Sequence, residues 1–226
     1  MKDRVDCGTP TGGLPVMLSL NDSLRQINAG LARIREFRPL WEKEYSYDPV
    51  LTPEEVAAFE EKHSCRLPEE YREFLLQVGN GGFGGVYELN QHFSDSGHEE
   101  CLKDDVGLSL PFPGLRYLKD EDCEDAEDRF SPRHAPGSII ICDEGCGTWL
   151  RLVITGPFAG EIWVDDRINI DEGFYPHLAP DGPTYRFLPW CRDWVARCVY
   201  QYGHKGNPNR DPGEGGADLS ELMKDR

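Results

Sequence analysis

The sequence predicts an α+β fold in which helices pack on one face of a twisted, mainly antiparallel sheet. Apolar residues recur at three- and four-residue spacings over 19–37, 52–78 and 184–202, which is typical of amphipathic helices. Residues 139–166 instead contain three short apolar runs separated by glycine-containing turns. An antiparallel meander requires this pattern.

The helical segments carry recognisable boundaries. The first helix is expected over about 19–37, because Pro39 prevents it from continuing. In the second, Thr52 can cap the helix, Pro53 suits its first turn, and Glu55 stands where a capping box places its acid. The third begins after Pro68 with an acid-rich first turn.

The alternation of side chains along the meander predicts which face each residue occupies. In the middle strand, the apolar residues Leu150 and Leu152 are expected to face the helices. Trp149 then points to the opposite, outer face. In the following strand, Trp163 and Asp165 are expected on that same outer face beside Trp149.

The composition changes along the chain predict one domain with loose ends. Residues 1–17 are interpreted as a flexible lead-in, 18–203 as a single domain with an N-terminal helical extension, and 204–226 as a flexible tail. Residues 119–128 hold seven carboxylates against one lysine. Burying such a block is costly, so it is expected at a solvated surface.

The charge of the chain narrows the classes of partner. There are 41 acidic and 24 basic residues among 226, a formal net charge of −17. Negative charge repels phosphate backbones and anionic lipid heads, so neither direct nucleic-acid nor membrane binding is expected. It favours encounter with a basic protein. No apolar segment is long enough to span a membrane or drive secretion, so a cytoplasmic location is expected.

The cysteines and histidines show no spacing of a metal or catalytic site. Cys142 and Cys146 form C-x3-C, but no second pair of matching spacing follows, so we expect structural thiols, no zinc and no cofactor. The glycine-rich passage 79–85 follows a helix and precedes a strand, the reverse of a phosphate-binding loop. No G-x-S-x-G elbow occurs, and no catalytic residue is assigned.

The helix pair LTPEEVAAFEEKHSCRLPEEYREFLLQVGNGGFGG resembles the N-terminal signature of the SUKH superfamily, L-P-x-x-Y-x-x-F-L followed by Asn-Gly-Gly. The meander at 139–167 and the tryptophan-rich helix at 187–199 are similar to the later parts of that domain. The resemblance implies an α+β domain without known catalytic residues. Bacterial members are commonly immunity proteins that bind and neutralise polymorphic toxins, and fungal members are regulatory proteins connected to cell-wall synthesis.

These observations together predict a non-enzymatic protein-binding module, an immunity protein whose basic partner is a nuclease-type toxin. Two alternatives stay open: a regulatory scaffold of the Smi/Knr type, and a hydrolase using clustered carboxylates with a divalent ion. Aromatic side chains within a charged rim are typical of interface patches. The expected partner-binding residues are Asp143, Glu144, Trp149, Trp163, Asp165 and Asp166. Burial of the two tryptophans under loops of the chain itself stays open as the alternative.

Overall fold

The computed structural model describes six stretches of the chain: residues 18–37, 48–81, 107–125, 128–169, 173–180 and 182–203. The expected lead-in and tail lie outside the described residues, as do residues 82–106 between the third helix and the meander. No helix in these stretches combines the length and apolarity needed to cross a membrane.

Four α-helices are present in the described residues: α1 (Leu20–Phe37), α2 (Pro53–His63), α3 (Glu69–Gln77) and α4 (Phe187–Gly203). The predicted capping box of α2 is confirmed. The Thr52 side chain accepts a hydrogen bond from the Glu55 backbone N–H, and the Glu55 carboxylate accepts one from the Thr52 backbone N–H. These two bonds satisfy donors that the first turn of a helix leaves unpaired.

Within the described stretches the sheet has five antiparallel strands in the order β1-β5-β4-β3-β2. The predicted meander is confirmed as β2 (Ser138–Gly145), β3 (Thr148–Val153) and β4 (Ile162–Asp165). Sequence reasoning missed β1 (Arg116–Tyr117) and β5 (Gly173–Pro176), which are too short to show an alternating pattern.

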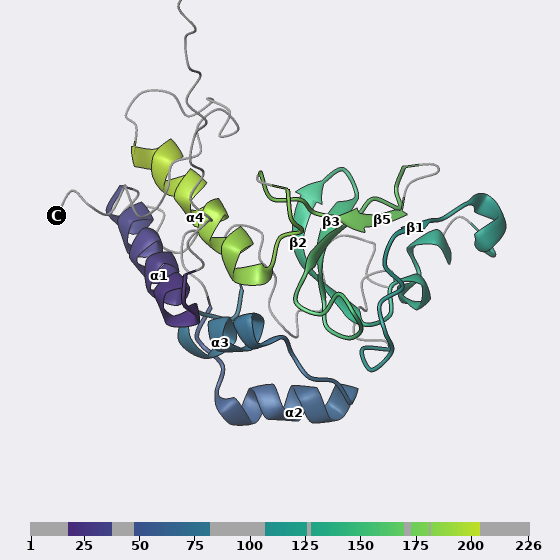
Figure 1. Ribbon diagram of the computed structural model, residues 1–226, viewed down its shortest axis with the longest axis horizontal. Helices are drawn as coiled ribbons and strands as arrows, with labels where there is room; N and C mark the ends of the chain where they lie inside the picture. The colour runs from purple at the N-terminus through teal and green to yellow at the C-terminus, as the bar shows by residue number, and fades with distance from the viewer. Residues whose placement is uncertain are drawn as a thin grey trace, which may run out of the picture.

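The helices cover one face of the sheet, as predicted. Figure 1 shows α4 between α1 and the sheet, with α2 and α3 beneath. Phe187 at the start of α4 packs edge-on against Tyr71 and Phe74 of α3, at ring-centroid distances of 4.8 and 5.0 Å. The Glu70 carboxylate of α3 accepts a hydrogen bond from the backbone N–H of Leu188. An acid at this position stabilises the N-terminus of α4.

The opposite face of the sheet is covered as well, by the chain itself. The described residues of 107–125 and 128–137, here called the cover segment, lie mainly on the side away from the helices (Figure 1), although Leu108 packs in the helix-side core. They include three short 3-10 turns, η2 (Asp120–Asp122), η3 (Asp128–Phe130) and η4 (Pro132–His134). The buried residues between this segment and the sheet form a second apolar cluster: Phe112, Leu118, Ala135, Val153, Trp163 and Phe174.

Gly137 joins the cover segment to β2 and to the end of β3. Its backbone N–H donates to the carbonyl of Gly107, and its carbonyl accepts from the backbone N–H groups of Ile154 and Thr155. The backbone of Gly137 has φ +67°, and a Cβ there would run into the Leu110 carbonyl oxygen. Only glycine fits this close approach without strain.

Candidate functional site

The structure separates the six predicted partner-binding residues into two groups. Asp143 and Glu144 are exposed at the β2–β3 turn, and Trp149 and Asp166 are partly exposed. Trp163 and Asp165 are buried, with 3% and 0% of their surfaces exposed. The prediction that Trp163 and Asp165 face solvent is therefore wrong.

The strand alternation behind that prediction is nevertheless right, because both residues do point away from the helices. The cover segment then shields them. Phe112 of the cover segment packs edge-on against Trp163 at 5.3 Å between ring centroids, and Phe158 of the β3–β4 loop makes a tilted contact at 5.0 Å. The Trp163 indole N–H donates to the Glu161 carboxylate at 3.1 Å. Trp163 is thus a core residue of the second apolar cluster.

Asp165 lies at the centre of a buried ionic network. Its carboxylate accepts from Arg151 Nη1 at 2.9 Å and from Arg167 Nε and Nη2 at 2.7 Å each. Burial would raise the pKa of Asp165, but the guanidiniums of Arg167 and Arg151 outweigh it and hold that pKa below its usual value. Asp165 is therefore a charged structural group and is unsuited to act as a general acid near neutral pH.

Arg167 extends this network into the cover segment. Its Nη1 donates to the backbone carbonyls of Arg129 and Ser131, at 3.0 Å each. Its guanidinium also lies over the Phe174 ring at 5.0 Å. Since carbonyl oxygens of the cover segment complete the hydrogen bonding of a buried cation, the segment is an integral part of the domain.

The residues that stay accessible lie at one end of the sheet, in or next to the β2–β3 hairpin and just after β4. Thr148 and Asp166 are joined by a 3.0 Å hydrogen bond between the hydroxyl and the carboxylate, and Ile168 packs against Gly147 of the β2–β3 turn. We call the set Asp143, Glu144, Trp149, Asp166 and Ile168 the hairpin-end surface. Sequence reasoning missed Ile168, which follows a strand and is 44% exposed.

Trp149 is oriented within this surface by a neighbour from the cover segment. Phe130 meets it edge-on, with ring centroids 6.4 Å apart. Asp143 lies directly opposite Trp149 on the adjacent strand. The hairpin-end surface thus combines an aromatic ring, an exposed isoleucine and carboxylates, a composition suited to binding a protein that carries basic residues.

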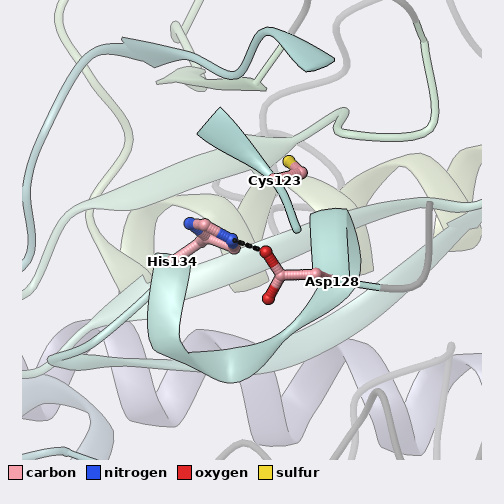
Figure 2. Close-up of side chains that lie close together, drawn as sticks. All are labelled: Cys123, Asp128 and His134. Atoms are coloured by element: carbon pink, nitrogen blue, oxygen red, sulfur yellow. Dashed lines mark hydrogen bonds and ion pairs between the residues drawn. The ribbon is translucent and has the colours of Figure 1, made fainter. Parts of the chain in front are cut away.

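A second cluster of reactive groups lies in the cover segment. In the described residues, one set of three donors that could hold a metal ion comes together: Cys123, Asp128 and His134, whose donor atoms all lie within 4.8 Å of one another. Figure 2 shows the contact between the His134 ring and the Asp128 carboxylate, 3.3 Å from Nε2 to Oδ2. Sequence reasoning missed this set because its spacing matches no regular motif.

The hydrogen-bond donors around Asp128 stabilise the ionised form of its carboxyl group. The Arg133 guanidinium bonds both carboxylate oxygens, and the Glu124 backbone N–H donates to Oδ2 at 2.9 Å. These contacts hold the pKa of Asp128 well below its usual range. Burial lowers the pKa of His134, so its imidazole is neutral at pH 7. Neutral imidazole is the form that binds metal ions.

Comparison with known proteins gives the family. Residues 50–182 match the model of the SMI1 / KNR4 family (SUKH-1). No curated protein matches the chain. The match begins just before α2 and ends before α4, and it includes the cover segment and the hairpin-end surface. Because it takes in more than half of the 226 residues, the chain belongs to the SMI1/KNR4 family, SUKH-1.

Proposed function

We propose that this chain is a non-enzymatic binding protein that recognises a basic protein through the hairpin-end surface and, as an immunity protein, neutralises a nuclease-type toxin. The observation that carries the proposal is the chemistry of that surface. Trp149 and Ile168 offer apolar contact area, and Asp143, Glu144 and Asp166 supply negative charge around them.

The charge of the whole chain supports the same partner class. A net charge of −17 creates a long-range field that attracts basic proteins and speeds their encounter. Toxins that cleave nucleic acid need basic surfaces to bind phosphate backbones. An acidic protein that covers such a surface would prevent the nucleic-acid substrate from binding to the toxin. Membership of the SMI1/KNR4 family supports this use of the fold by analogy.

The experiment begins with recovery of the partner. The full chain is used as bait in the native cell, and the bound protein is identified by mass spectrometry. Association is then measured with the double variant Asp143→Lys/Glu144→Lys, whose two positions are exposed. We expect slower association and a weaker dependence on salt, because the acids at the contact are lost.

A matched control separates local from global charge. The variant Glu54→Lys/Glu61→Lys changes the net charge by the same amount on the exposed side of α2. It should retain most of the affinity. Equal losses in both double variants would contradict a contact at the hairpin-end surface. A partner that is bound but keeps its activity would favour the regulatory scaffold instead.

A further inference from the structure

The Cys123, Asp128 and His134 group has donor spacing close to that of a bound metal ion. Ligand atoms of a tetrahedral zinc site, at about 2.0–2.3 Å from the metal, are separated from one another by about 3.3–3.7 Å. His134 Nε2 and Asp128 Oδ2 are 3.3 Å apart, and no pair in the group exceeds 4.8 Å. The Cys123 sulfur therefore has to move closer to the other two donors by about an ångström or less to reach zinc-ligand spacing.

The backbone around these donors is held in place. The backbone N–H of Asp128 donates to the Asp125 carboxylate at 2.8 Å, and the backbone N–H of His134 donates to the Ser131 carbonyl at 3.1 Å. The His134 side chain is 3% exposed. Two of the three donors are therefore pre-positioned, which reduces the entropy lost when a ligand binds.

Arg133 is the cation that pairs with Asp128 in the structure. Its guanidinium bonds both oxygens of Asp128 and lies 3.7 Å from Glu124. The Arg133 side chain is about half exposed, so it can swing into solvent without unfolding the segment. Exposed acids at Glu121 and Asp122 attract cations to this region. Arg133 and a divalent cation thus compete for one carboxylate.

We propose that Cys123, Asp128 and His134 bind a zinc ion, which displaces Arg133 from Asp128 and fastens the cover segment. The thiolate, imidazole and carboxylate set suits Zn²⁺, whereas Mg²⁺ and Ca²⁺ require oxygen ligands. The Cys123 thiol releases its proton on binding, and a water molecule takes the fourth position. The spacing of the cysteines predicted no zinc site, because no second pair matches Cys142 and Cys146. The set proposed here contains a single cysteine, and such a set leaves no cysteine spacing to recognise.

The test is a titration of the tag-free, reduced full chain with Co²⁺, a spectroscopic substitute for zinc. We expect about one equivalent to bind, with a thiolate-to-cobalt charge-transfer band that added Zn²⁺ abolishes. Cys123→Ser should remove the band and weaken binding at least about tenfold. The control Cys146→Ser changes the exposed cysteine of the β2–β3 turn and should leave the band intact.

Arg133→Gln supplies the sharper test. If the guanidinium competes with the ion, this variant binds Zn²⁺ several-fold more tightly; weaker binding would overturn the proposal. It is also overturned if Co²⁺ gives no charge-transfer band, or if the band survives in Cys123→Ser or disappears in Cys146→Ser. Alkylation of wild-type protein, followed by mass spectrometry, should show Cys123 protected by Zn²⁺. Unaltered alkylation of Cys123 would refute the site without any variant.

Discussion

Arg151 of β3 and Asp165 of β4 form an ion pair with an Nη1–Oδ2 distance of 2.9 Å, and neither side chain is exposed to solvent. Ser138 accepts a hydrogen bond from Arg151 Nε at 2.9 Å, and Arg167 donates to both carboxylate oxygens of Asp165. Every charged group of this network is therefore hydrogen-bonded, which offsets the cost of removing it from water.

Asp165→Asn should strongly destabilise the fold. The substitution leaves two buried guanidiniums without a counter-charge, and removal of one partner from a buried ion pair costs about 3–5 kcal/mol. Urea unfolding followed by circular dichroism measures the change in the free energy of unfolding. Asp166→Asn is the matched control, since Asp166 is partly exposed, and its loss should stay below about 1.5 kcal/mol. Similar losses in the two variants would contradict the role assigned to the network.

Local sequence signals predicted the helices and the meander well. The capping residues Thr52 and Glu55 determine where α2 begins through two hydrogen bonds that are local in sequence. The alternation in β3 correctly separated Leu150 and Leu152, which pack toward the helices, from Val153, which packs in the second apolar cluster. Period and capping are properties of short segments, and these can be read without knowledge of the tertiary structure.

The exposure of the outer sheet face could not be read in this way. Trp163 and Asp165 are buried because the cover segment folds back over them, a long-range event that no local period encodes. The alternation of Val106, Leu108 and Leu110 before Pro111 is typical of a strand and predicts one there, but this prediction is wrong, because residues 107–109 form a turn. Leu108 is buried and Leu110 is exposed.

The candidate site was only partly predictable for the same reason. The exposed acids Asp143 and Glu144 follow from a glycine-containing turn between two strands. Cys123 and His134 come together through short 3-10 turns, whose geometry leaves little trace in the sequence. The ion pair of Arg151 and Asp165 did leave a signal in the sequence. Strand alternation places these two residues of opposite charge on one face of adjacent strands, which favours a salt bridge between them.

Gly137→Ala should destabilise the attachment of the cover segment. An alanine pays about 1–2 kcal/mol to adopt the positive φ of this position. Its Cβ would in addition collide with backbone atoms of Leu110 and Phe112, which cannot move without breaking the hydrogen bonds around Gly137. The total loss should exceed about 2 kcal/mol in the free energy of unfolding.

Gly145→Ala isolates the backbone contribution. Gly145 also has a positive φ, +88°, but a Cβ there meets no atom within 4 Å. This variant should lose only the conformational term, about 1–2 kcal/mol. Comparable unfolding free energies for the two alanine variants would mean that the close approach at Gly137 contributes nothing.

His177 should make the free energy of unfolding depend on pH below neutrality. Burial lowers the pKa of its imidazole, and the nearby Arg197 lowers it further. Near pH 6.5 the unfolded chain therefore binds more protons at this residue than the folded chain does, so stability rises with pH. The stabilisation is fully present above the unfolded pKa and is lost progressively as pH falls from there through the lower folded pKa. Urea unfolding between pH 5 and 8 should show that the free energy of unfolding depends less steeply on pH in His177→Gln than in the wild type. An unchanged pH dependence would contradict the assignment to His177.

The reactivity of the thiols should divide according to burial and should report on the proposed interface. Burial raises the pKa of Cys142 to about 12, with Glu144 and Asp143 adding to the shift, and burial raises that of Cys198 to about 12. Because the thiolate is the reactive species, both should resist iodoacetamide in the folded protein. Cys146 is exposed at the β2–β3 turn and should be alkylated first of these three. Peptide mapping by mass spectrometry follows each residue separately, and urea provides the control in which all three react.

In the complex with its basic partner, Cys146 should become protected from alkylation, because it lies between Glu144 and Trp149 in the chain. Protection of Cys146 without a change at Cys65, which follows helix α2, would support the hairpin-end surface as the contact. Full reactivity of Cys146 in a saturated complex would place the contact elsewhere.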